Sequence, residues 1–91
     1  MQSTRAVRPF RFVIAPNVRQ AQLFIQFSGY NPRECRIATR RQDLLGYRLE
    51  QWETWFLQRM WPCRTREDVR HMEEMMLLAR ACGADIRRWW T

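Results

Sequence analysis

A short aromatic and β-branched run that passes directly into a helical pattern is the feature that most limits how this chain can fold. Phe10 to Ala15 (FRFVIA) is typical of a strand, and Pro16-Asn17 marks its end, with Asn17 as the expected N-cap of a helix. Apolar residues then cover a wide arc of a helix from Val18 to about Ser28, and Gly29 suits the residue after it. Glu34 to Thr39 alternates like a second strand. A helix between two strands predicts that the strands are parallel.

The segment from 43 to 61 allows two interpretations. Seven apolar residues would share one face of a single helix: Leu44, Leu45, Leu49, Trp52, Trp55, Phe56 and Met60. Gly46 argues against that helix, because glycine costs about 1 kcal/mol in a helix interior. Residues 54–57 (TWFL) suit a buried strand. We therefore expect a loop or short turn over 43–50 and a strand near 53–60, with one long helix as the alternative.

The last long element is a helix. Thr65 with Asp68 three residues later resembles a capping box, and the helix runs to about Cys82, where Gly83 ends it. The order of elements is then β-α-β-β-α. It predicts an α/β fold, a minimal Rossmann-like sandwich with a three-stranded, mainly parallel sheet. We expect a flexible basic arm over 1–9, one α/β domain over 10–83 and a basic-aromatic tail over 84–91.

The positive charge is concentrated in one half of the chain. The formal net charge is +7, and all sixteen basic residues are Arg. Residues 1–48 hold nine Arg against two acidic residues, whereas residues 49–91 hold seven Arg and seven acidic residues. One-sided charge of this kind suggests a polyanionic partner.

No sequence pattern indicates secretion, a membrane span or a metal site. The apolar runs are shorter than the ~18–20 residues of a membrane span, and no signal-peptide pattern follows Met1. Cys35, Cys63 and Cys82 form no CxxC pair and are expected to be reduced thiols. Cys63, His71 and Cys82 lack the paired spacing of zinc ligands. We therefore expect a cytoplasmic protein with no metal and no cofactor.

Catalytic and nucleotide-binding motifs are missing from the sequence as well. Neither GxGxxG nor GxxxxGK[ST] occurs, so dinucleotide and P-loop sites are not supported. His71 has no nucleophile or carboxylate at a spacing that defines a triad. Glu73 and Glu74 are adjacent, and on a helix they point about 100° apart, which does not suit an acid/base pair. The sequence predicts a protein that is not an enzyme.

Ligands of open α/β sheets gather at the carboxyl ends of the strands. The start of the first helix would offer its backbone amides to an anion at that edge. Polar and basic residues follow each expected strand, and these are the candidate nucleic-acid-binding residues of the sheet: Asn17, Arg40, Arg41, Arg64 and Arg66.

The two ends of the chain supply further candidates. Arg5, Arg8 and Arg11 could contact phosphates, and Trp89 with Trp90 could stack on exposed bases. A purely solvating role for the arginines, with the Trp pair covering the sheet, is the alternative.

The run FRFVIAPN…QAQLFIQFSGYNP…CRIATRRQDLLGYRLEQWETWFL resembles short uncharacterised proteins of actinobacterial phages. These in turn resemble a truncated second motor domain of DNA helicases, in which a strand, a turn and an apolar strand follow one another. The turn here is Asp43-Leu44-Leu45-Gly46. The resemblance spans roughly residues 10–80 and implies an α/β core and a phage origin, hence the host cytoplasm. The arginine motifs that sense nucleotide and the motor domain with its phosphate loop are missing, so ATPase or unwinding activity is not implied.

Two functions follow as hypotheses. The first is a small accessory protein that binds nucleic acid through its basic half, as a monomer or homodimer. The second is an interaction module that binds and modulates a host protein, because Trp, Tyr and Arg dominate interface hot spots. Exposed side chains at Trp52, Trp61, Trp89 or Trp90 would favour the second hypothesis.

Overall fold

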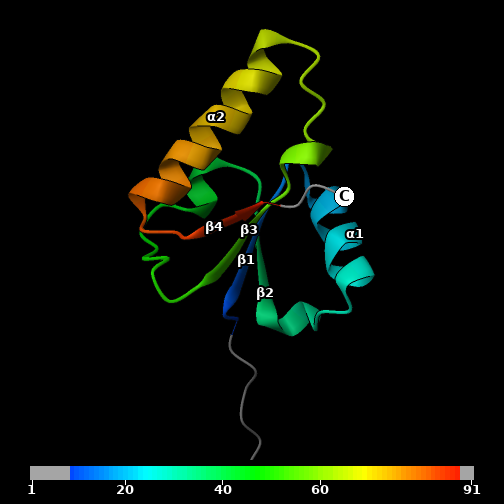
Figure 1. Cartoon of the computed structure of the whole chain (residues 1–91), viewed down its shortest axis with the longest axis vertical. Coiled ribbons are helices and arrows are strands. Elements are labelled where there is room, and N and C mark those ends of the chain that lie inside the picture. Colours follow the sequence, from blue (N-terminus) through cyan, green and yellow to red (C-terminus); the bar gives the residue numbers. More distant parts are fainter. Residues whose placement is uncertain (1–8, 89–91) are drawn as a thin grey trace, which may run out of the picture.

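Four strands and two α-helices make up the described part of the chain, residues 9–88 of a computed structural model. The two helices cover opposite faces of the sheet, which gives three layers (Figure 1). The elements in chain order, where η marks a short 3₁₀ helix, are β1 (Arg11–Ile14), α1 (Val18–Ser28), η1 (Pro32–Glu34), β2 (Cys35–Ala38), η2 (Arg41–Asp43), β3 (Glu53–Phe56), η3 (Gln58–Met60), α2 (Arg66–Ala81) and β4 (Ile86–Arg88).

The strands lie in the order β2-β1-β3-β4, and each neighbouring pair is parallel. Val13 of β1 lies opposite Ile37 on one side and opposite Trp55 on the other. The predicted parallel pairing of the first two strands is confirmed. Because all strands run the same way, their carboxyl ends meet at one edge of the sheet and their amino ends at the other.

Alternate residues of β1 face two separate apolar cores. Phe12 and Ile14 pack in the core under α2, and Val13 and Ala15 pack in the core under α1. All four of these side chains are fully buried. A strand buried on both faces has a continuous apolar sequence, which explains why FRFVIA alternates so little.

Helix α1 begins and ends where the sequence predicts. The Asn17 side-chain oxygen accepts a hydrogen bond from the backbone N–H of Gln20 at 2.9 Å, which makes Asn17 the N-cap. Gly29 ends the helix in the left-handed conformation, with φ 71°. The wide apolar arc of this helix is covered only in part, because Phe24 is buried whereas Phe27 is 87% exposed.

Residues 39–52 cross the sheet on the side of α2 without forming a long helix. Leu44 and Leu49 are fully buried in the α2 core, and Gly46 lies between them with φ 84°. The predicted loop over 43–50 is confirmed, and the alternative of one long helix is wrong. The apolar residues whose spacing suggested a helix belong to a loop, and this loop buries Leu44 and Leu49 in the core between the sheet and α2. The strand expected near 53–60 ends at Phe56, and η3 follows it.

The sheet has four strands, so the prediction of three is wrong. The fourth, β4, lies within the segment that was expected to be a tail, and it pairs with Thr54–Phe56 of β3. It is only three residues long and two of them are arginines, so its sequence lacks the apolar alternation of a strand. Ile86 packs against the α2 core, and pairing with β3 supplies the stability that local sequence does not.

Helix α1 gives a direct test of the core. We expect Phe24→Ala to lower the free energy of unfolding by about 3–5 kcal/mol, because it removes a buried ring from the α1 core. The matched control is Phe27→Ala on the same helix, which should change it by less than about 0.5 kcal/mol because this ring is exposed. Urea unfolding measures both variants. Equal losses for the two would contradict the packing of α1 on the sheet.

The turn at Gly46 gives a second test. A β-carbon at this position meets no atom within 4 Å, so the backbone angle alone decides the outcome. Gly46→Ala should destabilise the protein by about 1–2 kcal/mol because of the left-handed backbone. Gly46→Asn should cost less, since asparagine tolerates this conformation better. A gain in stability for Gly46→Ala would support a helix here.

Candidate nucleic-acid interface

The carboxyl edge of the sheet carries the residues that follow β1 and β2. Asn17 follows β1, and Arg40 and Arg41 follow the neighbouring β2. All three residues are exposed. The side-chain oxygen of Asn17 is already used to cap α1. The two arginines are therefore the groups at this part of the edge that can attract an anion.

Asp43 holds the turn that presents these arginines. Its carboxylate accepts hydrogen bonds from the backbone N–H groups of Thr39 at 3.0 Å and Arg40 at 3.1 Å. It also lies 3.9 Å from the Arg40 guanidinium. Burial raises the pKa of Asp43, but the hydrogen bonds and the charges of Arg40 and Arg36 outweigh burial and leave the pKa below its ordinary value. Asp43 therefore partly neutralises Arg40, whereas Arg41 makes no ion pair within the described residues.

The start of α2 projects beyond the carboxyl edge, together with the loop before it (Figure 1). Thr65 caps the helix by accepting a hydrogen bond from the N–H of Asp68 at 3.1 Å, so the predicted capping box is confirmed. The Asp68 carboxylate in return accepts from the N–H groups of Arg64 at 3.0 Å and Thr65 at 3.2 Å. These two amides are therefore not available to an anion.

A hollow of about 540 Å³ opens beside this helix start, and we call it the arginine hollow. Arg64, Arg66 and Arg70 line it, and all three are exposed. Arg66 and Arg70 are four residues apart on α2 and so share one face of the helix. The remaining lining residues are Cys63, Thr65, Val69 and Glu73. Sequence analysis missed Arg70 as a site residue, although its spacing from Arg66 was a usable signal.

His71 fixes α2 to the end of β2. One ring nitrogen, Nε2, lies 2.8 Å from the backbone carbonyl of Thr39, and the other, Nδ1, lies 3.3 Å from the indole nitrogen of Trp61. A carbonyl only accepts and an indole N–H only donates, so the ring proton belongs on Nε2. Trp61 in turn stacks on Phe56 at the end of β3, with the ring centroids 5.0 Å apart. His71 is thus a structural residue that sets the position of the arginine hollow.

The arginines of the carboxyl edge do not form one site. Arg41 lines a separate depression of about 380 Å³ with Glu74, Leu77, Leu78 and Ala81, and this depression shares no residue with the arginine hollow. Arg41 lies beside the second half of α2, whereas the arginine hollow lies at the start of that helix. The basic residues that follow the strands therefore lie in two groups, and their shared role in nucleic-acid binding stays a prediction.

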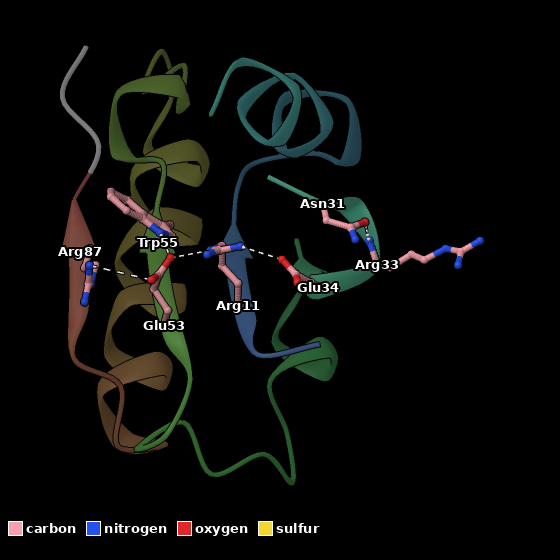
Figure 2. Close-up of polar contacts among 7 residues, drawn as sticks. All are labelled: Arg11, Asn31, Arg33, Glu34, Glu53, Trp55 and Arg87. Atoms are coloured by element: carbon pink, nitrogen blue, oxygen red, sulfur yellow. Dashed lines mark hydrogen bonds and ion pairs between the residues drawn. The ribbon is translucent and has the colours of Figure 1, made fainter. Parts of the chain in front are cut away.

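Arg11, predicted to contact phosphates, lies inside the protein. It is 8% exposed and stands at the amino end of β1, away from the carboxyl edge. Its guanidinium donates to Glu53 and lies 3.9 Å from Glu34 (Figure 2). It also packs 3.6 Å from the centre of the Tyr30 ring. The side chains of Arg11 and Val13 point to the same face of β1, the face that α1 covers. The prediction for Arg11 is wrong because neighbouring strands supply carboxylates that the local sequence does not reveal.

Glu53 is the centre of this buried ionic cluster. Besides Arg11, it accepts a hydrogen bond from the indole N–H of Trp55 at 2.7 Å and lies 4.0 Å from Arg87 of β4 (Figure 2). Burial raises the pKa of Glu53, but the hydrogen bonds and the two positive charges outweigh it and lower the pKa. For Arg11, burial disfavours the charged form and lowers the pKa. The hydrogen bond to Glu53 acts in the opposite direction and outweighs burial, so the pKa of Arg11 is raised. Both groups are therefore charged at neutral pH.

Four of the predicted site residues, Arg5, Arg8, Trp89 and Trp90, lie outside the described residues. Within residues 9–88, no three histidine, cysteine or acidic side chains are placed to hold a metal ion. The described helices include none with the length and apolar character needed to span a membrane. The chain matches no known protein family, curated protein or solved structure.

The lowered pKa of Glu53 predicts how stability changes with pH. A carboxyl group with a lower pKa in the folded state stabilises the protein fully above its unfolded pKa of about 4.3. That stabilisation is lost as the pH falls through the folded pKa. Glu53→Gln should therefore destabilise most at pH 7, and its difference from the original protein should shrink toward pH 3. Urea unfolding across this range measures the effect.

The control for this experiment is Asp85→Asn, which removes an exposed carboxylate outside the cluster. It should change stability little at any pH in the range. A Glu53→Gln difference that stays constant from pH 7 to pH 3 would contradict the charged pairing with Arg11.

Proposed function

We propose that this chain is a small, non-enzymatic accessory protein of phage type that binds nucleic acid through its phosphate backbone in the host cytoplasm. The observation that carries the proposal is the arginine hollow, where Arg64, Arg66 and Arg70 are exposed around one depression. Guanidinium groups pair with phosphate oxygens through two parallel hydrogen bonds, which favours arginine over lysine at such a site.

The position of the hollow supports the same proposal. The parallel strand order β2-β1-β3-β4 with helices on both faces supports a Rossmann-like arrangement as part of this proposal, and in such sheets ligands collect at the carboxyl edge. Arg40 and Arg41 follow β2 at that edge, and Arg41 lies beside the second half of α2, apart from the arginine hollow. A nucleic-acid backbone is an extended polyanion, so two separate basic groups can each hold a phosphate where a small ligand would meet only one. The interface suits backbone contacts rather than the reading of base sequence.

A salt titration tests this proposal. Binding to a labelled duplex should weaken linearly in a plot of log affinity against log salt concentration, with a slope of about −0.9 per phosphate contact. Replacing Arg64, Arg66 and Arg70 together with Gln should reduce the magnitude of that slope by roughly 2.7 units, if each arginine contacts one phosphate. Fluorescence anisotropy measures the affinity, and circular dichroism checks that the variant is folded.

The matched control removes three exposed arginines elsewhere, with Arg19, Arg48 and Arg80 all changed to Gln. This variant has the same net charge but should keep the slope within about half a unit. If the slope falls equally in the two variants, the effect comes from net charge and not from the arginine hollow. If the protein shows no salt-dependent binding to nucleic acid near about 50 mM salt, nucleic-acid binding is refuted.

A second candidate function is binding to a host protein. Trp61 is only 5% exposed and Trp52 is half-buried, so these tryptophans do not favour it. A small apolar patch on α1 does favour it: Leu23 and Phe27, four residues apart, are 39% and 87% exposed and line one depression.

A further inference from the structure

A groove of about 570 Å³ lies between α1 and the outer edge of β2, and we call it the edge groove. Its walls include Gln22, Ile25 and Gln26 of α1 on one side and Tyr30, Cys35 and Ile37 on the other. The lining is mainly apolar, with two amide side chains at the rim. The edge groove is far from the arginine hollow, since it lies on the α1 face of the sheet.

The backbone of β2 is open along this groove. The carbonyls of Glu34 and Ala38 accept hydrogen bonds from the strand β1 side, at 3.0 Å from the N–H of Phe10 and 3.1 Å from that of Ala15. Residues of a strand alternate in direction, so Cys35 and Ile37 present their backbone groups to the opposite, outer edge. No strand within the described residues pairs with that edge.

At both ends of the outer edge the backbone N–H groups already have hydrogen-bond partners. A short stretch with free backbone groups, which we call the window, lies between them. The N–H of Cys35 bonds to the carbonyl of Pro32, and the N–H of Thr39 bonds to the Asp43 carboxylate. The carbonyls of Cys35 and Ile37 and the N–H of Ile37 remain directed outward. Their side chains line the edge groove. Backbone groups for pairing and a pocket for an alternate side chain are the two parts of a strand-addition site.

The exposed charged side chains around the window are mainly positive, and this determines which kind of segment can bind there. Arg33 and Arg36 are exposed at the β2 edge, and Figure 2 shows Arg33 extending away from β1 into solvent. None of the residues that line the edge groove is acidic. Glu34 lies nearby, but it is drawn toward the buried Arg11. The surroundings therefore favour an acidic partner.

We infer that this edge binds an extended, acidic segment of a partner protein, which pairs with β2 as an additional strand and places one apolar side chain in the edge groove. A second copy of β2 in antiparallel pairing centred on the window would bring Arg36 opposite the Arg36 of the other copy, which like charges oppose. The N-terminal arm carries Arg5 and Arg8 and is opposed for the same reason.

The test uses a defined probe, the acetylated and amidated peptide EDVTVDVEE with a fluorescent label. Its alternating valines can enter the groove, and its acidic residues can meet the two arginines. We expect salt-dependent binding together with slower amide exchange at Ile37, measured by NMR. Two control peptides should bind at least about tenfold more weakly: one with alternate backbone nitrogens methylated and one with every acid replaced by lysine.

Variants of the protein locate the site. Arg33→Glu with Arg36→Glu should weaken peptide binding about tenfold or more, and Gln26→Trp should block the groove from an exposed helix position. Arg48→Glu with Arg80→Glu is the charge-matched control and should leave binding unchanged. Circular dichroism confirms that each variant is folded.

Three outcomes would overturn the inference: no binding of the probe up to about 1 mM, equal binding of the methylated peptide, or an unchanged exchange rate at Ile37. The variant lacking Arg64, Arg66 and Arg70 should bind the peptide normally. Failure of nucleic-acid binding and failure of peptide binding are therefore separate results.

Discussion

The pairing of β1 with a neighbour on each edge is the constraint on which the rest of the structure depends. A strand of four residues is short, yet its side chains enter both cores and its backbone joins β2 to β3. Both helices pack on side chains that this strand supplies. In a domain of this size, where a large share of the unfolded surface stays exposed on folding, few other residues could take over that role.

The ionic cluster at the amino end of β1 follows from the same constraint. Because every position of the strand is buried, its first residue, Arg11, must also be buried, and a buried guanidinium needs a carboxylate. The register places Glu53 directly opposite Arg11, so the compensating charge arises from strand pairing. The cluster extends to Arg87 of β4 and so connects three of the four strands.

Local signals in the sequence predicted the elements whose limits are set locally. Asn17 and Gly29 bound α1, and Thr65 with Asp68 begins α2, because caps are contacts between residues three or four positions apart. Gly46 correctly argued against a long helix.

Features that depend on distant partners could not be predicted in the same way. β4 has the composition of a tail and is a strand only because β3 lies beside it. The burial of Arg11 depends on Glu53, which is 42 residues away in the chain. Part of the candidate site was predictable, since Arg40 and Arg41 follow β2 and are exposed. The separation of the basic groups was not, because it depends on which part of α2 packs beside Arg41.

The short β4 also has a consequence for the protein during its synthesis. Of the four described strands it is the last to leave the ribosome, and until it does, β3 is the edge of the growing sheet. The nascent chain then exposes the unpaired backbone of a segment containing Trp55 and Phe56, the kind of edge that promotes association between chains. These three residues complete the described sheet, and the exposed Arg87 among them places positive charge at this edge. Positive charge on an edge strand opposes pairing with further copies, so the element that completes the fold also protects the finished protein from aggregation.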